Sequence, residues 1–322
     1  MINLKIAFVT AIEPVPPFNF DGTVHIPHHF LTPDSEWITR KYWQTMNYQD
    51  ELIGIKMMDR GTTNQPRIKI TIYSEKKLGS EKLGNILNEL NWRFRFNENI
   101  SEFYEKFRND KFLRPVFKKW KGMRFNCANS LYELLIISIA LQNASIGRTV
   151  QMMSNLFETY GKKLKFGNKE LFAYWKPEDL NEITEDELRI LKVGYRAKMI
   201  KKMSEAFSKR EINEYALREM PTENAKEQLM KLYGVGPATA QIILGEYLRK
   251  YDAFDLKGRL WEQKILSRIM FNRKSVPLER ITKTFDERYG NWKELAFHYI
   301  FTNVFWRHKE NKIDWLEKEI RI

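Results

Sequence analysis

The chain has 322 residues, of which 43% are hydrophobic, so it can bury the cores of two ordinary domains and is not a disordered chain. Lysine and arginine (54) outnumber aspartate and glutamate (41), which gives a formal net charge of +13. This excess favours a polyanionic partner, nucleic acid first and an acidic membrane surface second, with a basic surface kept for solubility as the alternative. The single cysteine, Cys127, excludes an intrachain disulfide and any zinc or iron–sulfur site built from several cysteines.

Histidines gather at His25, His28 and His29, with Asp21 upstream. Pro27 disfavours a helix that would align them, so we expect no metal site there. The apolar N-terminal run has no cleavage pattern and is too short to span a bilayer, and no other stretch reaches that length. The sequence therefore predicts a soluble, intracellular protein without a membrane partner, in the cytoplasm or nucleoid if its source is prokaryotic.

The N-terminal part predicts β-structure. Segments that alternate or are rich in β-branched residues lie between clusters of Pro, Gly, Asn and Asp, at 4–12, 23–31, 52–58 and 67–74. In the last of them, a period of two places Ile68, Ile70 and Ile72 on one face. These strands predict a small antiparallel sheet, and helical spacing follows at 80–90 and 101–112.

From about residue 128 onward the pattern is helical throughout. The stretch 129–142 is apolar nearly all round, which is typical of a buried helix. Ser145 and Gly161 are expected to begin and end the next helix, and Thr222 to cap a later one.

These patterns predict a protein of the α+β class with two domains. We expect a β-rich antiparallel N-terminal domain at 1–110 and an all-helical domain at 111–322. No internal repeat or low-complexity linker interrupts the pattern.

A Gly-x-Gly turn separates two predicted helices within residues 231–261. Gly234 and Gly236 allow positive φ and the close approach of another backbone. Pro237 suits the first helical position, and the free amides at this helix start could bind an anion such as a nucleic-acid phosphate. From the turn alone, a helical hairpin without an anion site is an equally supported interpretation.

The stretch "LYGVGPATAQIIL" (232–244) resembles the helix-hairpin-helix of base-excision DNA glycosylases. "LKVGYRAKMIKKM" (191–203) is similar to a Gly-[Phe/Tyr]-Arg-Ala segment of the 8-oxoguanine and 3-methyladenine glycosylases. "LLIISIALQNASIGRTVQMMSNLFETYG" (134–161) and "YGNWKELAFHYIFTNVFW" (289–306) resemble two further segments of these enzymes. Each motif is weak alone, but the order of all four indicates the helix-hairpin-helix (HhH-GPD) superfamily.

The resemblance implies a DNA glycosylase that binds double-stranded DNA, flips a damaged base and hydrolyses its N-glycosidic bond. The base would be an alkylated or oxidised purine, and the protein would need neither metal nor cofactor. Members that also cleave the strand carry a lysine where this chain has Ala238, so the resemblance implies a monofunctional enzyme, which we expect to be a monomer. The alternatives are a catalytically impaired protein that binds DNA or lesions, and an 8-oxoguanine-type glycosylase with lyase activity.

The family's catalytic carboxylate follows the hairpin and stabilises oxocarbenium character at the sugar or activates water. Asp255 is the candidate here, although it lies slightly nearer to Gly236 than the family spacing requires. Asp252 is the second candidate, with helix termination or pairing with Arg249 as its structural role. Lys257 is the third candidate, and its side-chain amine would be the reacting group.

The resemblance implies further roles residue by residue. The residues expected to contact the DNA backbone are Tyr233, Gly234, Val235, Gly236, Ala238 and Thr239. Asn143, with Gln142 beside it, would fill the gap left by the flipped base, or else cap a helix. Ala238, Tyr299 and Phe301 would line the base pocket. Arg196 would contact DNA or pair with a carboxylate, and Tyr195 is expected in the core.

Overall fold

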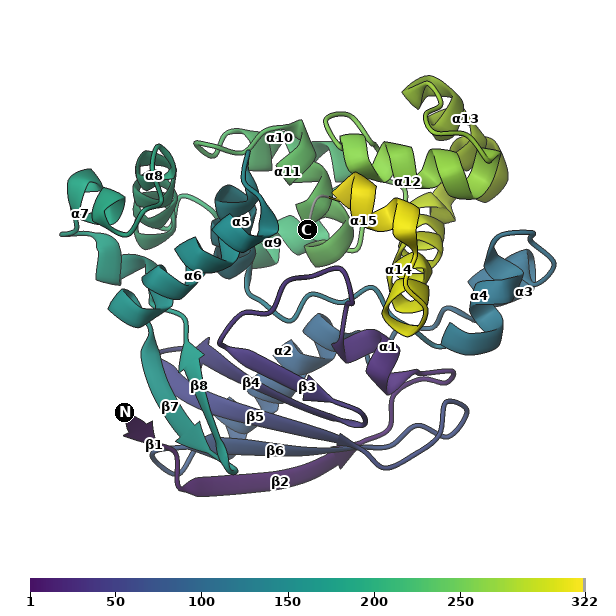
Figure 1. Cartoon of the computed structure of the whole chain (residues 1–322). Coiled ribbons are helices and arrows are strands. Elements are labelled where there is room, and N and C mark those ends of the chain that lie inside the picture. The colour runs from purple at the N-terminus through teal and green to yellow at the C-terminus, as the bar shows by residue number, and fades with distance from the viewer. Residues whose placement is uncertain (321–322) are drawn as a thin grey trace. The chain divides into compact units, whose positions relative to one another are not determined.

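The alternating N-terminal segments pair into a sheet in the computed structural model, which describes residues 1–320. The strand order is β2-β6-β5-β4-β3 with antiparallel neighbours, as Figure 1 shows. These strands are β2 (Ile6–Ile12), β3 (Ser35–Ile38), β4 (Lys41–Tyr48), β5 (Glu51–Asp59) and β6 (Ile68–Ser74). Ile68, Ile70 and Ile72 are at most 1% exposed, which confirms their predicted face. Helix α2 (Ser80–Phe94) packs Leu90 and Phe94 into the same core.

A second sheet contradicts the prediction that the chain is helical throughout after residue 128. In it, β1 (Ile2–Asn3) runs parallel to β7 (Lys162–Phe166), which pairs antiparallel with β8 (Lys169–Ala173). Gly167 and Asn168 both have positive φ, 47° and 67°, and join the last two strands in a two-residue hairpin turn. The Gly-Asn pair between two alternating segments was the signal in the sequence.

The strand predicted at 23–31 is wrong. Asn19 caps a short helix, α1 (Phe20–Val24), by accepting a hydrogen bond from Gly22 N. Pro27 then interrupts regular pairing, because it has no amide hydrogen for a ladder. The ring of His25 stacks on Trp37 at 4.1 Å between centroids. Among residues 1–320, no group of three His, Cys, Asp or Glu side chains is placed to hold a metal ion.

The chain forms two compact units that each draw on separate stretches of sequence. Unit 1 comprises Met1–His25, His29–Asn99 and Gly122–Lys209. Unit 2 comprises Ile26–His28, Ile100–Lys121 and the described residues from Arg210 onward. The sheet followed by helices confirms the α+β class, while the predicted domain limits, 1–110 and 111–322, stay a prediction.

Unit 1 completes its sheets with helices. They are α5 (Leu131–Leu141), α6 (Ile146–Tyr160), the 3₁₀ turn η1 (Pro177–Leu180), α7 (Glu185–Ile190) and α8 (Arg196–Ser208). Helix α5 is buried along most of its surface, as predicted, and Ser130 and Glu133 cap it reciprocally. Ser145 accepts from Arg148 N and Gly161 follows the last residue of α6, so both predicted ends of this helix are confirmed.

Unit 2 is helical. Its elements are α3 (Ser101–Phe107), α4 (Leu113–Trp120), α9 (Glu214–Glu219), α10 (Thr222–Met230), α11 (Pro237–Ile242), the π-helical η2 (Ile243–Tyr247), α12 (Leu260–Phe271), α13 (Leu278–Tyr289), the 3₁₀ turn η3 (Gly290–Trp292), α14 (Lys293–Glu310) and α15 (Asp314–Ile320). Helix α14 is buried over most of its length and supplies the aromatic centre of this unit. Across residues 1–320, no helix is long and apolar enough to cross a membrane.

Unit 1 also buries a carboxyl group. Asp34 is 2% exposed, and burial raises its pKa to about 7, with the charge of Glu133 adding to the rise. Hydrogen bonds from the side chains of Thr32 and Asn129 oppose that shift. The folded protein therefore keeps a proton on Asp34 in a pH range where the unfolded chain has lost it.

This proton makes stability depend on pH. Because the folded pKa of Asp34 lies above the unfolded value of 3.8, the free energy of unfolding should fall as pH rises from about 4 to 7 and then level off. From pH 5 to pH 8, the titration of Asp34 should lower the free energy of unfolding by about 3 kcal/mol. Asp34→Asn removes the titration, so its urea-unfolding free energy should vary less over that interval than that of the wild type. Equal pH dependence in the two proteins would contradict the assignment.

Candidate functional site

The predicted hairpin is present in unit 2 as α10, a turn and α11. Gly234 has φ of 89°, which a residue with a side chain adopts only under strain, whereas Gly236 is extended at φ −98°. A Cβ at Gly236 would meet no atom within 4 Å, so the turn is open beside it. Pro237 is the first residue of α11, as predicted. Thr222 is the first residue of α10 rather than its cap, which is Pro221.

The residues of the turn differ in what they present to a partner. The side chain of Tyr233 is 48% exposed, and Ala238 is half-buried. The side chains of Val235 and Thr239 are at least 92% buried, so these two positions offer backbone rather than side chain. Of the residues expected to contact the DNA backbone, Tyr233 therefore offers an exposed aromatic ring, and Val235 and Thr239 offer mainly backbone atoms.

The aspartate loop lies against the hairpin. Gly258 has φ of 82°, and a Cβ on it would lie 3.5 Å from the Cβ of Ala238. At the other end of the loop, Phe254 is 4% exposed and stacks on Phe285 with 4.3 Å between centroids. The loop that carries Asp255 is thus anchored by a buried ring and lies close to the first turn of α11.

The three candidates for the catalytic group have different surroundings. Asp255 is half-buried, and its Oδ1 accepts a hydrogen bond of 2.8 Å from Lys257 N. Asp252 is exposed and accepts from the hydroxyl of Thr222 at 3.0 Å, which ties the loop to the start of α10. It does not pair with Arg249 as the sequence suggested. Lys257 is exposed.

A turn in unit 1 presents Asn143. This residue is exposed with φ of 50°, directly after Gln142, the C-cap of α5. Its Nδ2 donates to the hydroxyl of Tyr195 at 3.2 Å, and that hydroxyl donates to the carbonyl of Gln142 at 3.3 Å. The guanidinium of Arg196 donates to the same carbonyl and to that of Val193. Tyr195 and Arg196, at the start of α8, therefore hold this turn in place by hydrogen bonds.

The expectation that Tyr195 lies in the core is wrong, because its side chain is 50% exposed. Arg196, 7% exposed, pairs with backbone carbonyls rather than with a carboxylate. A further contact of this region is made by Arg148, an exposed residue that donates to the carbonyl of Lys192 at 2.5 Å.

The aromatic residues of α14 lie deep in unit 2. Tyr299 is 0% exposed, and its hydroxyl lies 2.5 Å from that of Tyr104. Phe301 is 2% exposed and is contacted by His28 and Trp261, with centroids at 5.2 and 5.6 Å. His28 and Trp261 are themselves half-buried, so they are the partly accessible rings of this cluster.

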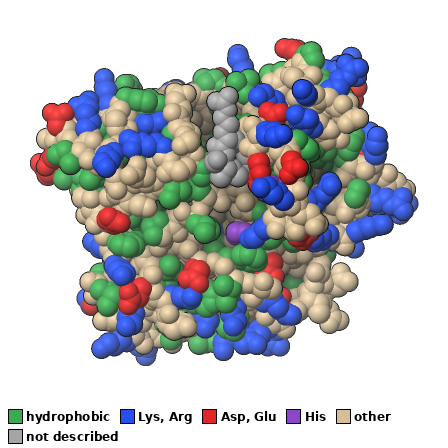
Figure 2. Space-filling model, viewed as in Figure 1, with side chains coloured by type: hydrophobic (Ala, Val, Ile, Leu, Met, Phe, Trp, Pro, Cys, Tyr) green, Lys and Arg blue, Asp and Glu red, His purple; other side chains and the backbone are tan. Residues whose placement is uncertain are grey.

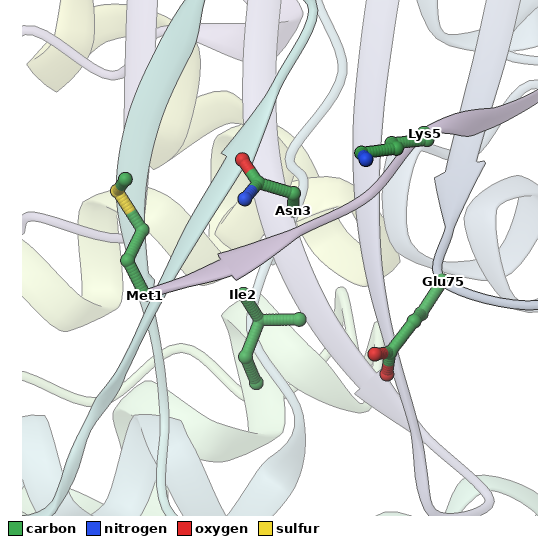
Figure 3. Close-up of a pocket in the computed structure, with 5 residues that line it drawn as sticks. All are labelled: Met1, Ile2, Asn3, Lys5 and Glu75. Atoms are coloured by element: carbon green, nitrogen blue, oxygen red, sulfur yellow. The ribbon is translucent and has the colours of Figure 1, made fainter.

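The structure thus brings the predicted residues together in two groups. Unit 2 joins the hairpin to the aspartate loop, and unit 1 joins Gln142 and Asn143 to Arg196. On the face drawn in Figure 2, Lys and Arg side chains cover more of the surface than Asp and Glu. A hollow of about 430 Å³ in unit 1, shown in Figure 3, is lined by Met1, Ile2, Asn3, Lys5 and Glu75 and contains none of the predicted site residues.

The two glycines of the hairpin should respond differently to a side chain. Gly234→Ala should lower the free energy of unfolding by about 1–2 kcal/mol, since φ of 89° disfavours any L-residue. Gly236→Ala, at an extended and open position, should cost about half as much or less. Urea unfolding of both variants checks this. Equal losses would show that the turn does not impose the backbone conformation of Gly234.

Comparison with known proteins agrees with this geometry. Residues 136–312, more than half of the chain, match the family described as HhH-GPD superfamily base excision DNA repair protein. A probable N-glycosylase/DNA lyase of Methanothermobacter thermautotrophicus is 26% identical over 200 residues, 56% of this chain and 63% of that protein. The DNA-3-methyladenine glycosylase of Bacillus subtilis is 22% identical over 215 residues, 66% of this chain and 70% of the relative.

Solved structures share the fold over nearly the whole chain. The 3-methyladenine DNA glycosylase of Archaeoglobus fulgidus superposes with a TM-score of 0.75 at 17% identity, covering 94% of this chain and 99% of that one. The 8-oxoguanine glycosylase/lyase of Clostridium acetobutylicum, in complex with double-stranded DNA, gives 0.68 at 21% identity, covering 95% and 99%. With its hairpin, its aspartate loop and the family match across residues 136–312, this chain belongs to the HhH-GPD superfamily of base excision DNA repair proteins.

Proposed function

We propose that this protein is a monofunctional DNA glycosylase that removes a damaged purine, alkylated or oxidised, from double-stranded DNA. The observation that carries the proposal is the close approach of Gly258 to Ala238, where a Cβ on the glycine would lie 3.5 Å from that of the alanine, so that the loop of Asp255 lies beside the hairpin. Asp252, by contrast, is engaged by Thr222. Among the relatives named above, the 3-methyladenine glycosylase supports an alkylated purine as the substrate, and the N-glycosylase/DNA lyase supports cleavage of an N-glycosidic bond.

Asp255 is the proposed catalytic carboxylate. The hydrogen bond from Lys257 N orients Oδ1, and a half-buried carboxylate interacts with a nearby positive charge more strongly than one in bulk water. As the glycosidic bond breaks, the sugar gains oxocarbenium character, which such a group stabilises while the base leaves. Water then attacks the anomeric carbon, and Asp255 accepts a proton from it.

Ala238 supports hydrolysis without strand cleavage. A lyase step needs an amine that attacks the sugar, and the alanine methyl group has no such chemistry. Lys257 is exposed, whereas nucleophilic lysines are commonly activated by desolvation or by a neighbouring cation. We therefore propose that the product is an intact strand with an abasic site.

DNA would be held by two groups of residues. The amides at the start of α11, with Tyr233 beside them, suit a phosphate. The net charge of +13 supports binding to a polyanion. In unit 1, Asn143 is proposed to enter the gap left by the flipped base, with Gln142 next to it.

The base pocket needs accessible rings. Tyr299 is fully buried, and its hydroxyl is hydrogen-bonded to that of Tyr104, so it could contact a base only if the core opened. We propose that Ala238 and the half-buried rings of His28 and Trp261 contact the base, with Phe301 packed behind those rings. Stacking on aromatic faces suits any purine and becomes stronger for a cationic alkylated one.

Replacing the proposed carboxylate tests the reaction. Asp255→Asn should lower single-turnover release of base by at least about a hundredfold, since one preorganised electrostatic group is commonly worth that much. The assay uses duplexes with an alkylated purine, hypoxanthine or 8-oxoguanine, followed by alkali and separation of the strands. Asp252→Asn is the matched control and should stay within about threefold of the wild type, because the amide oxygen of the new side chain can still accept from the hydroxyl of Thr222.

Other outcomes of this assay contradict the proposal. Loss of release in Asp252→Asn with retention in Asp255→Asn would exchange the two roles. Binding without release from any lesion would identify a lesion-binding protein. Strand cleavage without alkali, trapped by borohydride and abolished in Lys257→Ala, would show a lyase that uses that amine.

The turn that carries Asn143 gives a second prediction. Tyr195→Phe removes the hydroxyl that links Asn143 to Gln142 and should lower base release from duplex DNA by about fivefold, the value of one hydrogen bond. The loss should be smaller on a single-stranded lesion, where no gap has to be filled. The control Tyr215→Phe changes another exposed tyrosine, 52% exposed on α9, and should have no effect. An equal loss on both substrates would exclude a role in filling the gap.

A further inference from the structure

Ionisable side chains and one amide are buried next to the hairpin and the aspartate loop of unit 2. Glu294 at the start of α14 is 2% exposed, and Glu262 on α12 is 5% exposed. The side chain of Arg259, directly after Gly258, is 11% exposed, and Gln241 on α11 is 3% exposed. Burial of several ionisable groups is costly, and replacing them by apolar residues often stabilises a fold. Their presence here therefore calls for a reason other than stability.

The contacts of Glu294 reach both functional segments. Its Oε2 accepts from Gln241 Nε2 at 3.5 Å, which links it to the second helix of the hairpin. A Cβ at Gly245 would lie 2.7 Å from its Oε1, so the glycine in the π-helical turn after α11 makes room for the carboxyl group. Its backbone amide donates to the carbonyl of Tyr251 at 2.9 Å, at the beginning of the aspartate loop.

Arg259 completes the connection at the other end of this loop. Its Nε donates to Glu262 Oε1 at 3.0 Å, and its guanidinium lies 5.0 Å from the centre of the Phe297 ring, one turn after Glu294 on α14. Its amide donates to the carbonyl of Leu256, next to Asp255, at 2.9 Å. Within residues 1–320, Arg259 Nη1 and Glu262 Oε2 have no hydrogen-bond partner, so this network does not maximise stability.

We propose that Glu294 is a positioning residue for base removal, which holds α11 and the aspartate loop in register so that Asp255 faces the sugar. The inference rests on the proposed function. Glu294 does not touch substrate. It acts through Gln241 and Gly245 on one side and through Tyr251 and Arg259 on the other.

The chemistry of the group makes the test specific. Burial raises the pKa of Glu294 to about 8, opposed by Arg259 and reinforced by Glu246, with Gln241 and Lys293 lowering it slightly. The carboxyl group is therefore mostly protonated at pH 7, and glutamine is a close substitute for it. Ionisation above pH 8 buries a negative charge near Glu246 and near Arg259, whose guanidinium already pairs with Glu262.

Single-turnover base release and duplex affinity, measured separately at pH 7, distinguish positioning from folding. Glu294→Ala should lower the rate per folded molecule by about ten- to a hundredfold, as a displacement of about 1 Å does, with Kd for the lesion duplex within about threefold. Glu294→Gln should restore the rate to within about threefold. Above pH 8 the wild-type rate should fall, and the rate of Glu294→Gln should fall less.

A second variant guards against simple unfolding. Gly245→Ala forces the Glu294 side chain to move without leaving a cavity, and it should lower the rate with affinity retained. The matched control, Gly84→Ala, lies in α2 of unit 1, where a Cβ would meet no atom within 4 Å, and it should keep the wild-type rate.

Retention of the wild-type rate per folded molecule in both Glu294→Ala and Gly245→Ala would overturn the proposal. So would equal losses in Glu294→Ala and Glu294→Gln at pH 7, or parallel losses of rate and affinity. If the proposed function itself were wrong, the wild type would release no base from any lesion tested. That outcome is distinct from a failure of the role proposed for Glu294.

Discussion

The approach of Gly258 to Ala238 is the constraint on which the proposed chemistry depends. A Cβ at position 258 would lie 3.5 Å from the Cβ of Ala238, which is an ordinary van der Waals distance, so the aspartate loop and the hairpin pass close to one another here. The positive φ of Gly258 and of Gly234 shapes the two segments so that they meet. Position 238 therefore has two consequences: its small side chain admits the loop, and its lack of an amine directs the proposed reaction to hydrolysis.

Both units hold ionisable groups in their interiors, at a cost in folding free energy. In unit 1, Asp34 is buried near Glu133, and in unit 2, Glu294 is buried near Arg259 and Glu262. Desolvation raises the pKa of Asp34 and of Glu294 enough for each to hold a proton near neutrality. The two sites differ in their neighbours. Glu294 lies between the segments that carry the proposed catalytic residues, which is why we assign a role in the reaction to it and not to Asp34.

Much of the local structure was predictable from the sequence, because caps, glycine turns and periodicity act over a few residues. Ser145, Gly161 and Pro237 lie at the helix ends expected of them, and the isoleucines of β6 share one buried face. The errors also have local causes. The strand predicted at 23–31 overlooked the cap at Asn19, and the hairpin of β7 and β8 was hidden by the helical patterns around it. Tyr195 was expected in the core, but it lies directly before α8 and is 50% exposed.

The sequence by itself determined the helical hairpin, the absence of a lysine at position 238, and the order of motifs that identifies the superfamily. It left three candidates for the catalytic group, two carboxylates and one amine, since Asp252, Asp255 and Lys257 lie within six residues of one another. Only the tertiary structure gave them different surroundings, by pairing Asp252 with Thr222 and setting the loop of Asp255 beside Ala238, and our proposal of Asp255 rests on that difference. It also revealed the buried contacts of Glu294 and the hydrogen bonds of Tyr195. Burial and hydrogen bonding depend on residues that are distant along the chain, and no local pattern encodes which of them will meet.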